Sequence, residues 1–347
     1  MSDRITWVDA ARGMGISLIF LGHVWSLEDP SRAYEVIYSF HVPLFFFLSG
    51  ITLSVGRRQR PVDAVRHRAR TLLLPYAFYG LLGYAVYLFG FMVTSYAGVH
   101  IEAFDYGLWQ PLAGVLFGTL GEGGLVNSPV WFLTGLFSAF VMLIGIRAAF
   151  ESGTARTGAV LIVFVLGLSL APVIRLPFSL IPATLALIFL HAGAELGPRM
   201  LTVSVRNPAR WLIPAIFVTG IVTLLSPLNG FMELGHGQVG QPGFYLLFAV
   251  AGIGLIVLLA SLNTRLNKAF AVIGRWSLAI LVTHMLVIKG VQVLISMTTG
   301  LSLAEQQQAL LPGLLVLAIS AALTWPVILI ARRLLPPVLT GQPHQKR

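Results

Sequence analysis

The chain of 347 residues contains no cysteine and few charged side chains. The absence of cysteine excludes disulfide scaffolds, zinc sites with thiolate ligands, iron–sulfur clusters and cysteine nucleophiles. Charged residues make up 10% of the chain, whereas an ordinary soluble domain contains about 25%. So few charges cannot keep the surface of a protein of this size in water. Because apolar residues make up 56%, the composition indicates an integral membrane protein.

Apolar segments long enough to cross a bilayer recur along the whole chain. A helix needs roughly 20 mostly apolar residues to cross the hydrocarbon core. The ten segments lie at 13–28, 37–55, 72–95, 129–146, 158–174, 177–195, 211–227, 243–262, 276–297 and 310–331. Their apolar runs do not alternate with polar residues, as the strands of a membrane barrel would. We therefore predict an all-α fold, a polytopic helical bundle with about ten transmembrane helices.

The basic residues are distributed unevenly between the predicted loops. If the N-terminus is cytoplasmic and every segment crosses, only Arg32, Arg175 and Lys289 of the 23 Lys and Arg lie outside the cytoplasmic parts. This is the asymmetry of the positive-inside rule, and it predicts that the N-terminus and the C-terminus are both cytoplasmic. The net charge of +10 is then explained by membrane orientation, and we expect no nucleic-acid partner. In the outer loop 96–128, the segment 112–120 is apolar enough to lie at the interface or to re-enter the membrane.

The first apolar segment carries ionisable residues at helical spacing. Arg12 and His23 are about three helical turns apart, so they share one face and lie roughly 16 Å apart along the axis. Asp9 is one turn before Arg12 and is placed to pair with it. Ionisable residues in a bilayer mark functional sites, and histidine suits proton transfer near neutral pH. We therefore favour a functional role for His23 over simple packing, in which Arg12 would only reach toward the cytoplasm.

The second segment opens with His41-Val-Pro43 and continues through a run of phenylalanines to Ser49-Gly50. Because proline suits the first turn of a helix, we expect His41 at or just before a helix N-terminus. There it would be a base, a hydrogen-bond donor to a ligand or a cap. Ser49 and Gly50 are small residues that permit close helix contact. A catalytic triad at Ser49 lacks an acidic partner, so we reject it.

The densest basic stretch lies between the second and third segments. Its members are Arg57, Arg58, Arg60, Arg66, His67, Arg68 and Arg70. Arg66 and Arg70 share a helix face, and arginine binds phosphate through two parallel hydrogen bonds. The stretch could hold a phosphate-rich cytoplasmic ligand such as a nucleotide or coenzyme A. From charge alone, membrane orientation and contact with anionic lipid headgroups are the simpler explanation.

Two further positions carry candidate side chains. Trp131, near the start of the fourth segment, suits an interfacial aromatic anchor. His284 lies in the middle of the ninth segment, where function and helix–helix hydrogen bonding are equally good explanations. His23, His41 and His284 offer three imidazoles, but their spacing does not require a metal and carboxylate partners are scarce. We therefore predict no metal site.

Five pieces of the sequence, taken in order, resemble acyltransferase family 3. They are Arg12-x10-His23, the segment from His41 to Gly50, Leu74-Pro75-Tyr76, the residues Val-Trp-Phe-Leu at 130–133, and 273–278 together with His284. The resemblance runs from about residue 4 to residue 331, and is strongest to the branch of fucose 4-O-acetylase-like membrane acetyltransferases. It implies one acyltransferase domain over 1–347 that ends in a short basic cytoplasmic tail, 332–347.

The resemblance implies a multi-pass O-acyltransferase in the inner membrane of a bacterium, in contact with membrane lipids. Such proteins take an acyl group, usually acetyl from cytoplasmic acetyl-CoA. They place it on a hydroxyl of a cell-surface glycan or a lipid-linked sugar, as in polysaccharide modification. By the same resemblance, His23 is expected to be the base or a transient acyl carrier, and Arg12 is expected to orient the thioester or the pantetheine arm. His41 is expected to orient the acceptor.

The expected donor-binding residues are less closely matched. They are Arg66, Arg68, Arg70 and Tyr76. The family's usual pair of arginines, three residues apart beside the third helix, is replaced here by Arg66-x-Arg68-x-Arg70, with Arg57-x-x-Arg60 further upstream.

Two other classes of function fit the same residues. A proton-coupled exporter of sugars or lipids would use His23 and His284 as a proton relay. A non-catalytic subunit of a polysaccharide assembly complex would tolerate replacement of His23. Binding of acetyl-CoA separates the enzyme from the exporter, because an exporter has no need of it.

Overall fold

The computed structural model describes residues 6–25, 31–54, 60–98, 104–121, 124–202, 208–262 and 264–341. Within these residues the regular elements are helices, and nine of them are long and apolar enough to cross a membrane. The predicted all-α, polytopic fold is confirmed. The chain is a multi-pass integral membrane protein.

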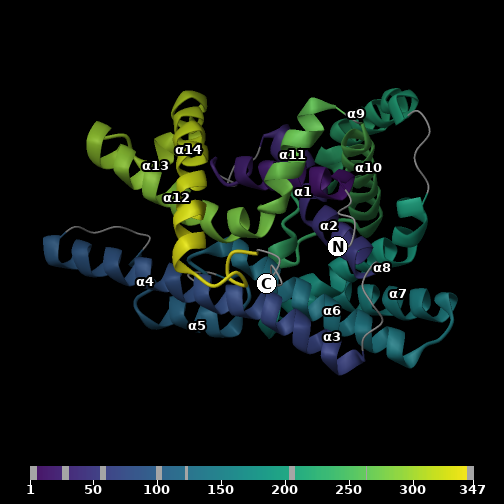
Figure 1. The fold of residues 1–347 in the computed structure, drawn as a ribbon. Coiled ribbons are helices and arrows are strands. Elements are labelled where there is room, and N and C mark those ends of the chain that lie inside the picture. Colours follow the sequence, from purple (N-terminus) through teal and green to yellow (C-terminus); the bar gives the residue numbers. More distant parts are fainter. Residues whose placement is uncertain are drawn as a thin grey trace.

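Fourteen α-helices follow one another along the described parts of the chain (Figure 1). They are α1 (Thr6–Leu21), α2 (Arg32–Ser54), α3 (Pro61–Arg68), α4 (Leu74–Ala97), α5 (Trp109–Phe117), α6 (Trp131–Ala149), α7 (Gly153–Leu170), α8 (Leu180–Thr202), α9 (Leu212–Asn229), α10 (Pro242–Ser261), α11 (Arg265–Arg275), α12 (Ser277–Thr299), α13 (Leu303–Gln308) and α14 (Leu310–Leu334). Shorter turns join some of them. Those used below are the π-helical turn η1 (Ala69–Leu73) and the 3-10 turns η3 (Ser128–Val130), η4 (Pro177–Ser179) and η6 (Leu234–His236).

The predicted membrane segments coincide with these helices, with one difference at the first segment. The nine candidate spans match the segments predicted from 37–55 onward, with shifts at their ends. The first segment, predicted over 13–28, is α1, which has 16 residues and begins and ends earlier. At 1.5 Å per residue α1 is about 24 Å long, so it is too short to be counted among the nine. The cytoplasmic placement of both chain ends stays a prediction.

The start of α2 corrects the expectation for His41. The helix begins at Arg32, and the amide groups of Tyr34 and Glu35 donate hydrogen bonds to the carbonyl of Ser31. Pro43 therefore lies inside the helix, and His41 is not at a helix N-terminus. The expectation was wrong because a transmembrane helix tolerates an internal proline when its surroundings satisfy the freed backbone groups.

Glycines bring two pairs of helices into backbone contact. A Cβ on Gly50 of α2 would collide with the backbone of α8 at Leu190, and Gly193 of α8 has the same relation to α2. Gly13 of α1 and Gly274 of α11 exclude a Cβ in the same way, each against the backbone of the other helix. Small residues let membrane helices approach closely. The close contact predicted at Gly50 is confirmed.

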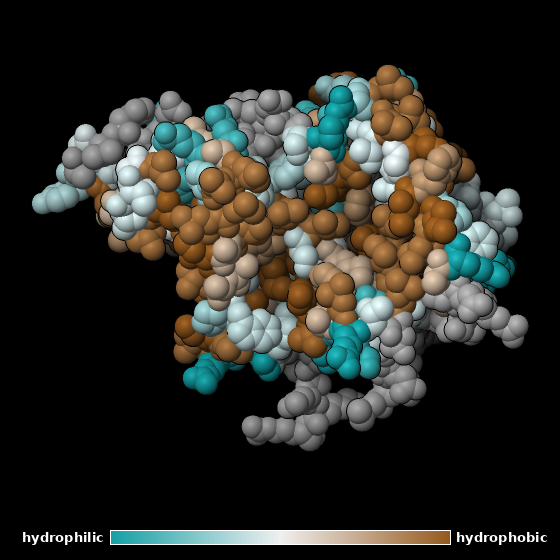
Figure 2. Space-filling model, turned by 90° about the horizontal axis from the view of Figure 1, so that it is seen from above, coloured by the Kyte–Doolittle hydropathy of each residue, from teal (hydrophilic) through white to brown (hydrophobic). Residues whose placement is uncertain are grey.

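The surface of the bundle is apolar where lipid is expected. Large hydrophobic side chains such as Phe89 of α4, Leu224 of α9 and Leu311 of α14 are exposed. Figure 2 shows that hydrophobic residues cover much of the face seen from above. At the other end of the chain, residues 335–341 follow α14, and Leu335 and Leu339 pack back against the core. This part of the predicted tail is therefore attached to the bundle, whereas 342–347 lie outside the described residues.

Replacement of Gly50 by alanine is expected to lower the thermal unfolding midpoint of the detergent-purified protein. The added Cβ meets backbone atoms, which cannot move aside as a flexible side chain can, and overpacking typically costs about 1–3 kcal/mol. The matched control is Gly145→Ala in α6, where nothing lies within 4 Å of an added Cβ. That variant should keep the midpoint or raise it slightly. Equal midpoints for the two variants would contradict the close contact.

Candidate functional site

A cavity of about 960 Å³ lies inside the bundle and follows α1 along its length. Its lining runs from Val8, Asp9 and Arg12 at one end of α1 to Ile19 and His23 at the other. Because Arg12 and His23 are eleven residues apart, the cavity extends roughly 16 Å along the helix axis. Its volume is in the upper part of the range that ligand sites in proteins occupy.

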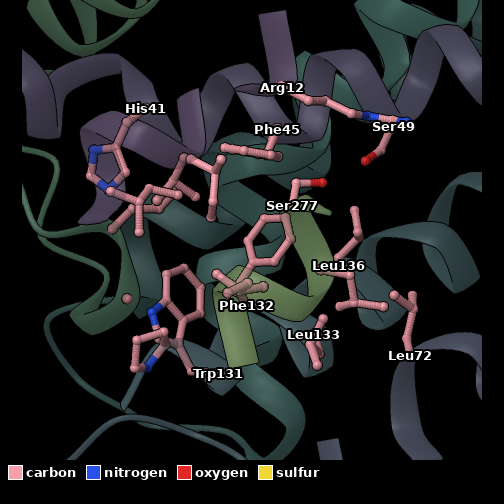
Figure 3. Close-up of a pocket in the computed structure, with 18 of the residues that line it drawn as sticks. Arg12, His41, Phe45, Ser49, Leu72, Trp131, Phe132, Leu133, Leu136 and Ser277 are labelled. Carbon is pink, nitrogen blue, oxygen red and sulfur yellow. The ribbon is translucent and has the colours of Figure 1, made fainter. Parts of the chain in front are cut away.

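The second wall comes from α2, which runs in the opposite direction. Tyr38 and His41 lie at the His23 end of the cavity, and Ser49 and Thr52 lie at the Arg12 end. At the Arg12 end, Nη2 of Arg12 donates a hydrogen bond of 3.3 Å to Oγ1 of Thr52. At the other end, the Tyr38 hydroxyl donates a bond of 2.9 Å to the carbonyl of Gly22 in the turn after α1. In Figure 3, Arg12 and Ser49 lie at one side of the cavity, whereas His41 and Trp131 lie at the other.

The Arg12 end of the cavity is rich in positive charge. Arg12, Arg68 and Arg275 line it, together with the carboxylate of Asp9. The guanidinium carbon of Arg68 lies 4.1 Å from the ring centroid of Phe140, a cation–π contact that holds the group at the wall. Three guanidinium groups against one carboxylate suit an anionic ligand. The pairing predicted between Asp9 and Arg12 stays a prediction.

The structure separates the four predicted donor-binding residues. Arg68 lies on the cavity, whereas Arg66 and Arg70 are exposed and are not part of its lining. Residues two positions apart on a helix point in nearly opposite directions, so the three arginines cannot act on one ligand here. The Tyr76 hydroxyl donates to the carbonyl of Val115, and it lies off the cavity lining. Arg57 and Arg58 lie outside the described residues.

The rings of His23 and His41 are each held by a hydrogen bond to the backbone carbonyl four residues earlier. Nδ1 of His23 lies 2.7 Å from the carbonyl oxygen of Ile19, and Nδ1 of His41 lies 2.8 Å from that of Ile37. A carbonyl oxygen can only accept, so each Nδ1 carries the hydrogen. In the neutral ring the lone pair is then on Nε2. Both residues line the cavity, and each therefore offers a proton-accepting nitrogen to a ligand.

His284 of α12 lies behind His23, away from the cavity lining. Its side chain is fully buried, and its Nε2 lies 3.4 Å from Nδ1 of His23. Nδ1 of His284 donates a hydrogen bond of 2.8 Å to the carbonyl of Ile280, which leaves Nε2 as an acceptor. The two rings meet edge to face, with centroids 5.0 Å apart. Of the two explanations left open for His284, the structure contains the helix–helix contact, and its partner is the cavity histidine of α1.

Two loops complete the wall at the His41 end. Leu120 and Gly121 follow α5 and line the cavity, and the position of 112–120 relative to the membrane stays a prediction. This stretch is fixed at Gly118, whose carbonyl accepts hydrogen bonds of 2.8 Å from Thr134 and from Ser179 of η4. The loop between α9 and α10 supplies residues 233–236.

Trp131 differs from its predicted role as an interfacial anchor. Its side chain is 8% exposed and belongs to the cavity wall. The indole packs against Gly235 of η6, where a Cβ would come within 3 Å of the ring. The turn before it is also inside the bundle, where Asn127 is fully buried and its Nδ2 donates a hydrogen bond of 2.9 Å to the carbonyl of Val282 in α12.

Sequence reasoning missed Arg275, Glu233 and His236 as cavity residues. Arg275 belongs to one of the five recognised pieces, yet it was counted only among the charges that orient the protein. For Glu233 and His236, the signal was a Glu-x-x-His spacing in an outer loop, which is too common to single out a site.

Within the described part of the chain, no group of three or more His, Asp or Glu side chains is placed to hold a metal ion.

A bundle of membrane-spanning helices around a cavity with polar and charged groups at both ends defines a multi-pass membrane protein with a candidate ligand site. The chain matches the model of the acyltransferase 3 family, described as an acyltransferase domain, over residues 5–331. No curated protein and no solved structure matches it. Because the match covers nearly the whole chain, the protein belongs to this family and is a membrane acyltransferase. The family assignment supports the enzyme class over the exporter.

Carbethoxylation of the intact protein by diethyl pyrocarbonate should distinguish the three membrane histidines. The reagent attacks a neutral imidazole at its free nitrogen, so His23 and His41 should react through Nε2 from the cavity. His284 should react last, because its side chain is fully buried outside the cavity lining. Peptide mass spectrometry over a time course measures the order. Modification of His284 as fast as that of His23 would contradict the arrangement.

Proposed function

We propose that this acyltransferase moves an acyl group, in the first place acetyl, from cytoplasmic acyl-CoA to a hydroxyl group. The acceptor is a cell-surface glycan, a lipid-linked sugar or a related molecule, and the reaction is an O-acetylation. One observation carries the proposal: a single cavity joins an end lined by three arginines to an end lined by two histidines with free Nε2 atoms. The proposed membrane is the inner membrane of a bacterium.

The donor end of the cavity is the Arg12 end. Coenzyme A carries several phosphate charges, and guanidinium groups bind phosphate through paired, charge-assisted hydrogen bonds. Arg68 and Arg275 are the candidates for the phosphates, since both line the cavity at this end. Arg12 lies deeper along α1 than Asp9 and is placed to orient the pantetheine arm or the thioester. The positive-inside asymmetry supports a cytoplasmic location for this end.

The acyl transfer is centred on Nε2 of His23. In a direct transfer, the acceptor oxygen attacks the thioester carbonyl carbon while Nε2 of His23 takes the hydroxyl proton. The carbon–sulfur bond then breaks, and the departing thiolate takes the proton from the imidazolium. In a relay, Nε2 first attacks the thioester and expels the coenzyme A thiolate, which leaves an acyl-imidazolium. The acceptor hydroxyl then attacks the acyl carbon, the bond to Nε2 breaks, and the hydroxyl proton passes to the thiolate. Both routes need the same lone pair. His41 shares this end of the cavity and is placed to orient the acceptor.

His284 is a positioning residue in this proposal. When His23 gains a proton, its Nδ1–H becomes a stronger donor. Two acceptors face that hydrogen, the carbonyl of Ile19 at 2.7 Å and Nε2 of His284 at 3.4 Å. They keep the ring oriented and stabilise its charged form inside the bundle.

Acetyl-CoA and free coenzyme A are expected to raise the melting temperature of the detergent-purified protein, whereas ATP is not. A ligand that binds only the folded state stabilises it in a concentration-dependent manner. In Arg68→Ala the affinity should fall about tenfold or more, because one charged hydrogen-bond partner of the phosphates is lost. Arg66→Ala is the matched control, since Arg66 is exposed and off the cavity. No shift at millimolar acetyl-CoA in a folded protein would reject the proposed donor.

His23→Ala should lower acyl transfer by about 10²–10⁴-fold, the usual contribution of general acid–base catalysis, and leave the stabilisation by acetyl-CoA intact. Release of coenzyme A in native membranes measures the rate, with membranes that lack the protein as the blank. His67→Ala is the control, since His67 is exposed and off the cavity. An unchanged rate in a well-expressed His23→Ala variant would reject the assignment and favour a non-catalytic subunit.

A further inference from the structure

The loop between α9 and α10 closes the His41 end of the cavity and is rigidly held. The backbones of Glu233 and Gln238 exchange two hydrogen bonds, of 2.8 and 3.1 Å. The side chain of Asn229 clamps the base of the loop, donating to the carbonyl of Val239 at 3.1 Å and accepting from the amide of Gln241 at 2.6 Å. Hydrogen bonds therefore fix the loop both near its tip and at its base, so the backbone that carries its cavity-facing side chains has a defined conformation.

Apolar contacts seat the same loop against the cavity wall. Met232, Leu234 and Val239 are buried in the core, and Gly235 packs against the indole of Trp131. Burial of these three side chains and close contact at the glycine seat the loop against the cavity wall. Glu233 and His236 are among its lining residues.

Glu233 and His236 form a pair within this loop. Oε1 of Glu233 lies 3.0 Å from Nδ1 of His236, and both side chains are about a quarter exposed, at 27% and 28%. One carboxylate oxygen faces the imidazole, and the carboxylate keeps its remaining acceptor capacity. A partly exposed acceptor group at the wall of an internal cavity is available to a ligand.

The charges of the cavity lining are sorted by end. Among the described lining residues, three arginines and Asp9 lie at the Arg12 end, whereas Glu233 is the one carboxylate and the one fixed charge at the His41 end. The other polar groups at that end are hydroxyls and imidazoles, on Tyr38, Ser128, His23, His41 and His236. Among the lining residues at that end, an anionic ligand therefore meets no cationic side chain. Arg175, which packs against Gly121, and Lys289, which donates a hydrogen bond to the carbonyl of Val126, lie behind the lining.

We propose that Glu233 and His236 form the acceptor subsite and select a sugar unit without an acidic group. The inference rests on the proposed acyl transfer and deepens it by naming the substrate class. The Glu233 carboxylate accepts hydrogen bonds from sugar hydroxyls, His236 lies beside it with Nδ1 3.0 Å from Oε1, and the Trp131 side chain offers an apolar face to the sugar ring. A uronic acid is rejected, because a second negative charge in a low-dielectric cavity is repelled by Glu233.

The test compares two probes that differ at C6, methyl α-D-glucoside with a hydroxymethyl group and methyl α-D-glucuronoside with a carboxylate. Purified protein receives acetyl-CoA with either probe, and coenzyme A release is followed with a thiol reagent. Methyl glucoside should raise the rate above that without acceptor, with a kcat/KM at least tenfold above that of the uronic acid. In Glu233→Gln the KM for methyl glucoside should rise about tenfold, the discrimination should shrink, and the KM for acetyl-CoA should stay unchanged.

Glu305→Gln is the matched control, because Glu305 is an exposed glutamate of α13 that bonds to Ser302 away from the cavity. It should behave as the wild type with both probes. The proposal is overturned if the wild-type protein uses both probes equally, if Glu233→Gln keeps the wild-type KM, or if neither probe raises the rate of a protein that acetyl-CoA stabilises. The comparison on the wild type needs no variant to fold. Failure of the acyl-transfer proposal looks different, since acetyl-CoA then neither stabilises the protein nor releases coenzyme A.

Discussion

Backbone contact at glycine, between α1 and α11 and between α2 and α8, fixes the two helices that form the polar walls of the cavity. Lipid chains are as apolar as the helices they surround, so the hydrophobic effect does little to draw membrane helices together. Close approach and interhelical hydrogen bonds supply the attraction instead. Gly13 and Gly274 set the distance between Arg12 and Arg275, because they join α1 to the helix that ends at Arg275. Gly50 and Gly193 place α2, and with it His41 and Ser49, in the same way.

The cost of polar groups inside a membrane shapes the histidines of this site. An unpaired donor in an apolar interior is expensive, and His23, His41 and His284 each place Nδ1 at the carbonyl of the residue four positions earlier. That bond satisfies the donor within the residue's own helical turn, and it also leaves Nε2 as the basic nitrogen. The bond that makes a buried histidine tolerable is therefore the bond that prepares it for proton transfer.

Charge is separated along the cavity. The arginines gather where α1 begins and α2 ends, and the carboxylate of Glu233 lies where α1 ends and α2 begins. An antiparallel pair of helices brings residues from opposite ends of two sequence segments to the same depth. A reaction with two substrates of different charge suits such a cavity, because each substrate meets its complementary end and the reactive group lies between them.

The spacing of residues in the sequence determined those features of the protein that lie within a single helix. Apolar segments predicted the bundle, and helical periodicity placed Arg12 and His23 on one face, because both facts belong to residues close in sequence. Pro43 misled the expectation for His41, since the tolerance of α2 for an internal proline depends on its neighbours. The choice of Arg68 over Arg66 and Arg70, the contact of His284 with His23 and the entry of Glu233 into the cavity were decided only by tertiary structure. Each depends on a helix or loop that packs from a distant part of the chain, and sequence spacing carries no information on such contacts.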